Sequence, residues 1–186
     1  NINGWGDCGI LKSFRDWAYN RGETIRATTS FLMADSTTPD GDYIKPQTNP
    51  TNTDCWNGKA YTPLNQLTPG RTKYGTNNNV RIFRYADVLL MNAEAKIKNG
   101  KSGDAPFNEV RRRAQMPELT NVTFEQVIDE RRMELVCEWG ERYNDLVRTG
   151  LAKTELKGWS EDKALLPLPF NQYTQIPDLL KEPKDE

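Results

Sequence analysis

Residues 84–95 read RYADVLLMNAEA, and with their neighbours they predict a helix from Phe83 to Ile97. The stretch is rich in Ala, Leu, Met and Glu, which are among the strongest helix formers. Asn99-Gly100 follows directly, and a glycine after the last turn is a common helix end. A helix of about four turns is therefore expected here.

The residues after this helix favour further helices. A second helix is predicted from Pro106 to about Ala114, because proline suits the first turn of a helix. Residues 123–126 form the capping-box pattern Thr-Phe-Glu-Gln, which opens a third helix expected to run to about Trp139. A fourth, short helix is expected at residues 144–151.

Short connections between such helices favour antiparallel packing, as in helical hairpins and α-solenoids. The tail from Leu165 to Pro183 carries four prolines, so it is expected to run extended over the surface. Residues 81–186 are therefore predicted to form a mainly α region with an extended, proline-rich tail.

The first 80 residues have a different composition. They contain most of the Thr and Asn and are interrupted repeatedly by Pro and Gly, which permits short strands and turns but few long helices. A helix at residues 11–19, a strand at 28–33, and a turn at 39–42 from which Tyr43-Ile44 returns are expected. Residues 1–80 are therefore predicted to form an irregular, loop-rich subdomain.

The overall composition excludes several classes of function. The 186 residues include 25 Lys+Arg, 26 Asp+Glu and no His, for a net charge of −1. No basic field would attract nucleic acid, and no apolar run is long enough to span a membrane. The lack of His removes the commonest general base and zinc ligand. The composition therefore argues against the common forms of acid–base catalysis, and we expect no metal and no cofactor.

Three cysteines add little chemistry. Cys8, Cys55 and Cys137 show no CxxC spacing, which argues against a zinc site or a thioredoxin-like motif. Cys8 and Cys55 could pair in an oxidising compartment, whereas Cys137 is expected within a helix as a free core thiol. A cysteine nucleophile would lack a histidine partner.

Arg131 falls on the apolar side of the third predicted helix. Four apolar residues share that side, namely Phe124, Val127, Ile128 and Leu135. A buried guanidinium requires carboxylate partners. The candidates are Asp145, Glu138, Asp87 and Glu94, and Asp145 is the preferred one. A structural ion pair is favoured over a catalytic arginine.

Two other charged segments have plain interpretations. Successive residues of a helix point about 100° apart, so residues 111–113 (Arg-Arg-Arg) cannot converge on one anion. One inward-turned arginine on a solvated face is expected instead. Asp40-Gly41-Asp42, with Asp35 and Asp54 near by, lacks the full calcium ladder and is interpreted as a turn.

Aromatic residues of the first half predict a binding site for a ligand with a polar ring, such as a sugar. Five of them lie among Gly, Asn, Asp and Thr, namely Trp5, Tyr43, Trp56, Tyr61 and Tyr74. Sugar rings stack their C–H faces on aromatic rings and direct hydroxyls to polar groups. Alternatively, each aromatic simply anchors its own loop.

Several motifs of the second half follow one another in a fixed order, namely RYADVLLMNAEA at residues 84–95, NEVRRRA at 108–114 and DERRMEL at 129–135. This is a resemblance to the SusD/RagB family of surface glycan-binding lipoproteins. It extends to Gly140, Arg142, DLVR at 145–148 and LLPLP at 165–169, so that order and spacing agree over about residues 81–170. Trp139 departs from it, because the family commonly has Glu before this Gly.

The resemblance implies the C-terminal third of a tetratricopeptide-type helical fold. The rest of the scaffold and a lipidated cysteine are expected upstream, outside this chain, so that the whole protein is anchored to the outer membrane at the cell surface. It also implies non-catalytic capture of glycan and delivery to a SusC-like TonB-dependent transporter. A peptide-binding member of the family and a scaffold that contacts only the transporter stay open as alternatives.

The expected ligand-binding residues combine the aromatic analysis with this function. Trp5, Tyr43 and Trp56 are the stacking candidates. Asp54 and Asn57, which flank Trp56 in the sequence, are the expected polar partners. The glycan itself is not specified by these residues.

Overall fold

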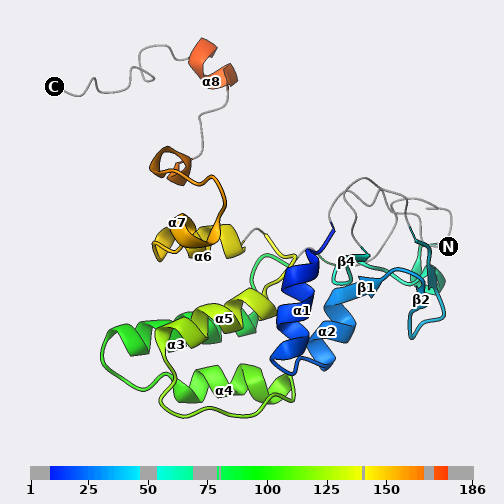
Figure 1. Cartoon of the computed structure of the whole chain (residues 1–186), viewed down its shortest axis with the longest axis horizontal. Helices are drawn as coiled ribbons and strands as arrows, with labels where there is room; N and C mark the ends of the chain where they lie inside the picture. Colours follow the sequence, from blue (N-terminus) through cyan, green and yellow to red (C-terminus); the bar gives the residue numbers. More distant parts are fainter. Residues whose placement is uncertain are drawn as a thin grey trace. The chain divides into compact units, whose positions relative to one another are not determined.

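The computed structural model of the chain describes residues 9–46, 54–68, 79, 81–139, 141–165 and 170–175 (Figure 1). The chain divides into two compact units, residues 1–142 and 143–186. The division falls within α6 (Glu141–Arg148). The described helices include none that is both long enough and apolar enough to cross a bilayer.

The first unit begins with two helices and a small sheet. α1 (Lys12–Asn20) and α2 (Ile25–Ser30) are followed at once by β1 (Phe31–Met33). β1 pairs in antiparallel fashion with β4 (Cys55–Asn57), with Leu32 opposite Trp56. The predicted helix at residues 11–19 is confirmed within one residue at each end.

The strand expected at residues 28–33 is half wrong, because residues 28–30 form the last turn of α2. Thr28 and Thr29 each donate a side-chain hydrogen bond to a carbonyl one turn earlier, at 2.9 and 3.1 Å. This satisfies their hydroxyls within a helix, although β-branched residues usually favour strands. Only residues 31–33 continue as a strand.

A hairpin follows β1. β2 (Ser36–Thr37) and β3 (Tyr43–Ile44) pair in antiparallel fashion around the predicted turn. Gly41 adopts φ +90°, a conformation that glycine accepts most easily. The Asp42 carboxylate accepts hydrogen bonds from the Tyr61 hydroxyl and the Leu64 amide, so it holds η1 (Leu64–Gln66) against the turn. The interpretation of this acidic segment as a turn is confirmed.

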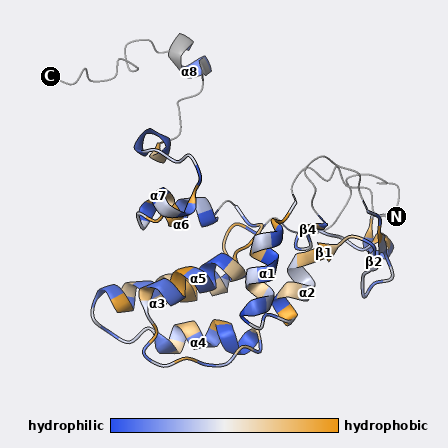
Figure 2. Ribbon diagram, viewed as in Figure 1, coloured by the Kyte–Doolittle hydropathy of each residue, from blue (hydrophilic) through white to orange (hydrophobic). Residues whose placement is uncertain are grey.

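Three longer helices form the rest of the first unit. They are α3 (Tyr85–Lys98), α4 (Asp104–Arg113) and α5 (Phe124–Glu134), and α3 packs against both of the others (Figure 1). Thr123 and Gln126 form the predicted capping box at the start of α5. Hydrophobic and hydrophilic residues alternate along α3 and α5, as expected of helices with one buried side (Figure 2).

The helices bury one apolar cluster, which we call the helical core. It consists of Ala86, Leu89, Leu90, Ala93, Phe107, Val110, Val122 and Val127. A second cluster lies under α1, α2 and the β1–β4 pair, and α5 contributes Met133 to it. Its members are Ile10, Ala18, Ala27, Phe31, Cys55 and Met133. α5 therefore takes part in both clusters.

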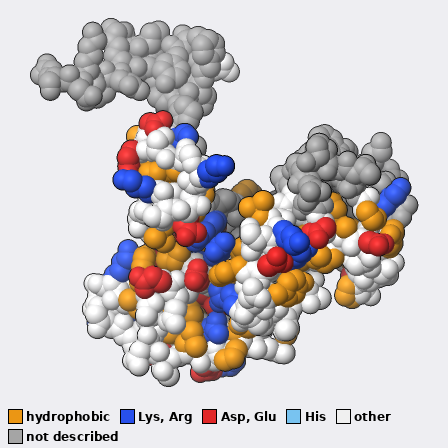
Figure 3. Space-filling model, viewed as in Figure 1, with side chains coloured by type: hydrophobic (Ala, Val, Ile, Leu, Met, Phe, Trp, Pro, Cys, Tyr) orange, Lys and Arg blue, Asp and Glu red, His pale blue; other side chains and the backbone are white. Residues whose placement is uncertain are grey.

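Three carboxylates, which we call the carboxylate row, lie along one side of α5 and continue beyond its C-terminal end. The row consists of Glu130, Glu134 and Glu138, spaced four residues apart. Glu130 and Glu134 are buried, and Glu138 is half-buried. Figure 3 shows acidic and basic side chains gathered between α5 and the two N-terminal helices.

Glu130 is completely buried, with a relative exposure of 0%. It accepts N–H donors from Arg21 at 2.6 Å, Arg26 at 2.6 Å and Arg111 at 2.8 Å. Arg111 is thus the predicted inward-turned arginine, while Arg112 pairs with Glu118 on the surface. Three helices are tied to α5 through one carboxylate.

Glu134 continues the same pattern. It pairs with Arg26 at 3.2 Å, Arg84 at 2.8 Å and Arg113 at 2.5 Å. Burial alone would raise the pKa of Glu134, but its hydrogen bond from Arg84 and the charge of Arg113 lower it below its ordinary value. Burial alone would likewise lower the pKa of Arg26, but Glu130 and Glu23 raise it. Glu134 and Arg26 are therefore held in their charged forms.

Arg131 is buried, as its place on the helix predicts. Its guanidinium donates to Asp87 of α3 at 2.6 Å, and Glu141 lies 3.5 Å away. Asp87 is one of the four partners expected from the sequence. A pair between Arg131 and Asp145 stays a prediction.

The second unit consists of short elements. The remainder of α6 is followed by α7 (Ala152–Glu155), η2 (Glu161–Ala164) and α8 (Phe170–Gln175). Asp145 is buried and accepts two N–H groups of Arg148, at 2.9 and 2.6 Å. The extended course expected of the tail is wrong for α8, which forms in the stretch without proline between Pro169 and Pro177.

Candidate functional site

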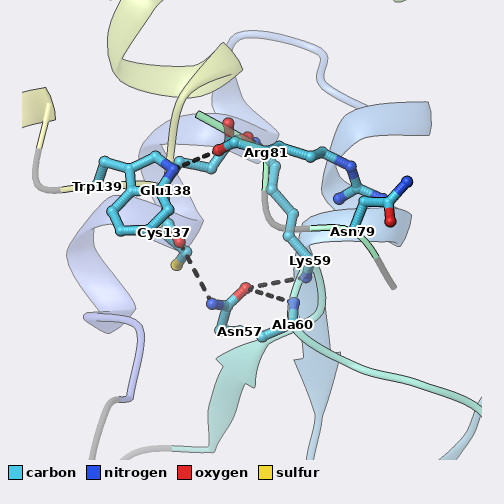
Figure 4. Close-up of a pocket in the computed structure, with 8 residues that line it drawn as sticks. All are labelled: Asn57, Lys59, Ala60, Asn79, Arg81, Cys137, Glu138 and Trp139. Carbon is cyan, nitrogen blue, oxygen red and sulfur yellow. Dashed lines mark hydrogen bonds and ion pairs between the residues drawn. The ribbon is translucent and has the colours of Figure 1, made fainter. Parts of the chain in front are cut away.

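A pocket of about 330 Å³ lies in the first unit, where three segments meet (Figure 4). One segment is the end of β4 with the turn after it, another precedes α3, and the third follows α5. The lining residues are Asn57, Lys59, Ala60, Asn79, Arg81, Cys137, Glu138 and Trp139. Figure 4 shows the Trp139 ring on one side and the Arg81 and Asn79 side chains on the other.

Trp139 is the aromatic residue of this pocket. Its side chain is strongly exposed, with a relative exposure of 62%, and its indole N–H donates to the Arg81 carbonyl oxygen. The hydrogen bond limits rotation of the ring, so that the ring stays at the edge of the pocket. A large aromatic side chain held in this way offers a stacking surface to a ligand.

The turn that carries Trp139 forms because α5 ends early. The sequence predicted a helix to about Trp139, but α5 ends at Glu134, and both Cys137 and Trp139 adopt positive φ, at 62° and 32°. Lys59 and Arg84 donate to the Glu134 carbonyl at 2.6 and 2.7 Å, and cations of this kind stabilise the C-terminal end of a helix.

The early end of α5 also corrects the prediction for Cys137. Instead of lying in the core of a helix, Cys137 is exposed and lines the pocket. Cys55 is the buried thiol, and burial raises its pKa to about 12. Cys8, the other member of the pair considered from the sequence, lies outside the described residues.

Lys59 and Glu138 close the pocket at its base. Lys59 Nζ lies 2.6 Å from a Glu138 oxygen, and Arg84 Nε binds the other Glu138 oxygen at 2.7 Å. Burial lowers the pKa of Lys59 in spite of the opposing effect of Glu138. At the base of the pocket, the positive charges of Lys59 and Arg84 are therefore balanced by carboxylates at the end of the carboxylate row.

Gly58 makes this arrangement possible. A Cβ atom at this position would lie 2.4 Å from the Thr29 carbonyl oxygen, which no real contact allows. The Gly58 amide instead donates to the Ser30 carbonyl at 2.8 Å. Only glycine lets the turn after β4 pack so closely against the end of α2, with Lys59 directed toward α5.

Arg81 differs from the other cations near the pocket. It is exposed, and among the described residues no carboxylate lies within ion-pair distance of its guanidinium. Lys59 and Arg84 are both neutralised by glutamates of the carboxylate row. Arg81 therefore gives the pocket its excess positive charge.

The predicted ligand-binding residues are distributed over the first unit. Asn57 lines the pocket, where its side-chain oxygen accepts from the Lys59 amide at 2.9 Å and its NH₂ donates to the Cys137 carbonyl at 3.4 Å. Trp56 is half-buried, and its indole N–H has no hydrogen-bond partner among the described residues. Trp5 lies outside the described residues.

Tyr43 and Asp54 are not among the pocket residues. Tyr43 is exposed and its hydroxyl donates to Asp35 at 2.7 Å, which leaves the ring faces accessible. Asp54 is exposed and pairs with Arg15 at 2.5 Å; the Arg15 hydrogen bond lowers the pKa of Asp54. The binding roles of all five residues stay predictions.

Sequence reasoning missed Trp139 and Arg81 as pocket residues. The signal for Trp139 was present, because it is the position at which the chain departs from the expected Glu before Gly. Arg81 gave no signal, since an arginine before a helix is common.

The side chains of the pocket suit a polar ligand that contains a ring. They include the aromatic ring of Trp139, the amides of Asn57 and Asn79, and the guanidinium of Arg81. The described residues include no group of three side chains suited to hold a metal ion.

The sequence model of the SusD family matches residues 10–177. This chain belongs to the SusD family. The chain is 33% identical to SusD-like protein P38 of Formosa agariphila in an alignment of 119 positions that covers 54% of this chain and 24% of that protein. It is 36% identical to the starch-binding protein SusD of Bacteroides thetaiotaomicron over 81 residues, 43% of this chain and 14% of that protein.

Solved structures extend the similarity over nearly the whole chain. Surface glycan-binding protein A from Bacteroides thetaiotaomicron matches with a TM-score of 0.78 and 28% identity, covering 96% of this chain and 41% of that chain. Its complex with laminarihexaose matches with a TM-score of 0.76 and 26% identity, covering 94% and 41%. The mainly α, SusD-like fold is confirmed, and the chain spans well under half the length of these relatives.

Proposed function

We propose that this chain is part of a non-catalytic glycan-binding protein of the cell surface. The observation that carries the proposal is the match, over 94% of the chain, to a surface glycan-binding protein in complex with laminarihexaose. A starch-binding relative supports the same class of ligand. The ligand is therefore an oligosaccharide or polysaccharide.

The surface of the first unit supports this proposal. Tyr43 and Trp139 are exposed aromatics close to polar side chains, which is the combination that a sugar requires. Tyr43 and the half-buried Trp56, with Trp5, are proposed to stack against sugar rings, and Asp54 and Asn57 to bind hydroxyl groups. Stacking on an aromatic ring and hydrogen bonding to amides and carboxylates can bind a sugar without any catalytic group.

The cellular setting of this function is also a proposal. In the whole protein, a lipid anchor outside this chain would hold it to the outer membrane, and a SusC-like TonB-dependent transporter would take up the bound glycan. The family membership supports both statements. Glycan capture and uptake would then take place at one site on the cell surface.

Isothermal titration of the chain with laminarihexaose, maltohexaose and an uncharged hexapeptide tests the proposed function. At least one hexasaccharide should bind, and the peptide should not. Binding of the peptide alone would make the chain part of a peptide-binding member of the family. Binding of none would favour a scaffold that contacts only the transporter, and hydrolysis of a sugar would overturn the non-catalytic assignment.

The predicted stacking residues are tested in the same titration. Trp56→Ala and Tyr43→Ala should each weaken binding by about two- to tenfold, as expected for the loss of one aromatic contact. Tyr85→Ala is the matched control, because Tyr85 is an exposed aromatic of α3 outside the pocket. Unchanged affinity in both test variants would show that these residues are not in the binding site.

A further inference from the structure

We propose that the pocket between Trp139 and Arg81 is a subsite for an acidic sugar unit, one whose ring carries a carboxylate or a sulfate ester. This inference rests on the proposed function and specifies its ligand. It follows from three properties of the pocket: a fixed aromatic ring, an arginine with no carboxylate partner in the described part of the chain, and a limited volume. Each has a separate physical consequence.

The aromatic ring supplies the platform. Trp139 is 62% exposed, yet its N–H is bonded to the Arg81 carbonyl, so the ring is both accessible and fixed. Fixing the ring before binding reduces the entropy that a ligand must overcome. Among the pocket residues, Trp139 is the one aromatic. A single sugar ring can lie against it, with its substituents directed into the pocket.

The arginine supplies the preference for an anion. Glu138 already neutralises Lys59 at the base of the pocket, and its second oxygen is bound by Arg84. Arg81 has no carboxylate partner among the described residues. A guanidinium binds a carboxylate or a sulfate through two parallel hydrogen bonds, which gives it more strength and direction than a hydroxyl group would.

The amides and the volume set the size of the ligand. Asn57 and Asn79 lie on the pocket wall, where amides can bind sugar hydroxyl groups. Its 330 Å³ is near the lower end of the range of about 300–1,000 Å³ for small-molecule sites. The pocket therefore suits a short segment of a glycan, with the remainder of the chain lying outside.

Titration of the chain with three hexasaccharides at 0.15 M NaCl tests the subsite. The probes are laminarihexaose, which is neutral, a hexagalacturonate and a sulfated galactan hexasaccharide. One of the acidic probes should bind at least tenfold more tightly than laminarihexaose. The better of the two identifies the anionic group as carboxylate or sulfate.

Variants then connect the preference with the residues. Arg81→Gln should weaken binding of the acidic probe by about tenfold or more and weaken binding of laminarihexaose far less. Trp139→Ala should weaken binding of the acidic probe as well. Arg112→Gln, which alters an exposed arginine paired with Glu118, is the matched control and should have no effect. Circular dichroism and thermal melts check that each variant is folded.

The outcomes separate the two proposals. Laminarihexaose binding as tight as that of both acidic probes, or an Arg81→Gln variant with unchanged affinity for them, would overturn the acidic subsite and leave glycan binding intact. An equal loss in Arg81→Gln and Arg112→Gln would overturn it too, because the effect would be one of net charge. Failure of all three sugars to bind would overturn both proposals.

Discussion

The helices α3 and α4 and the N-terminal helices α1 and α2 are joined to α5 by different means. α3 and α4 bury an apolar cluster that includes Leu90 and Phe107. α1 and α2 have a smaller cluster. Buried ion pairs cross both junctions: Arg21 and Arg26 reach Glu130 from the N-terminal side, while Arg111 of α4 reaches Glu130 and Asp87 of α3 pairs with Arg131. With less apolar contact beside its ion pairs, the junction of α1 and α2 depends on charge to a greater extent than the junction of α3 and α4.

This difference has a physical consequence for how each junction can fail. Apolar contacts are not directional, so a smaller side chain weakens them in proportion to the volume lost. A buried ion pair contributes little net stability over an apolar pair, but removal of one partner leaves the other charge buried and is costly. The N-terminal junction should thus be precise in geometry and sensitive to single charges.

Glu130→Gln should have the largest effect on stability. It removes the charge that three arginines share and should lower the free energy of unfolding by about 3–5 kcal/mol. Urea unfolding followed by circular dichroism measures this loss. Hydrogen exchange should rise more in α1 and α2 than in α3 and α4. Glu118→Gln, at an exposed pair, is the control and should change stability by less than about 1 kcal/mol.

Where Glu130→Gln does not fold, Arg21→Gln gives a milder version of the same test. Arg21 lies at the half-buried edge of the network, while Arg26 and Arg111 keep Glu130 paired. Its loss should still raise exchange in α1 more than in α4. Equal exchange in all helices would contradict the distinction between the two junctions.

Leu90→Ala tests the other side of the comparison. Leu90 is fully buried in the helical core, so its truncation should cost about 2–5 kcal/mol. Here exchange should rise first in α3 and α4, the reverse of the pattern for Glu130→Gln. Val88→Ala on the exposed side of α3 is the control. A Leu90→Ala variant that loosened α1 first would contradict this picture.

Lys59→Met should have the smallest effect, within about 1 kcal/mol. Burial already disfavours the charge of Lys59, as the lowered pKa shows, and Glu138 keeps Arg84 as a partner after the substitution. Glu138→Gln should cost more, since it leaves Lys59 buried without its carboxylate. Thermal melts of the two variants compare them directly, and an equal or larger loss in Lys59→Met would be evidence against this asymmetry.

Local sequence patterns predicted much of the helical region. The Thr123 capping box, the Pro106 helix and the glycine after α3 are all present, because each depends on interactions within a few residues. The inward arginine among residues 111–113 also follows from helical geometry alone. Such features do not require knowledge of the tertiary fold.

Features that depend on distant partners were not predictable in the same way. Glu130 and Glu134 look like ordinary solvated residues of a helix. Their burial is explained only by arginines from other parts of the fold, namely Arg21 directly after α1, Arg26 of α2, Arg84 before α3 and Arg111 of α4. At the early end of α5, the Glu134 carbonyl likewise accepts from Lys59, which lies 75 residues earlier in the chain. The pocket forms at this point, so it could not be found from sequence periodicity.

The Trp139 turn has a further consequence for how this protein can change. On its protein side, Lys59 binds the Glu134 carbonyl and the Glu138 carboxylate. The Arg81 and Trp139 side chains are exposed to solvent and take part in none of these ion pairs. An exposed position such as Arg81 tolerates substitution with a change in stability of about 0.5 kcal/mol or less. A replacement at Trp139 instead loses the hydrogen bond to the Arg81 carbonyl and must adopt a positive φ. The proposed ligand preference of the pocket can therefore be altered at Arg81 on a framework that need not be rebuilt.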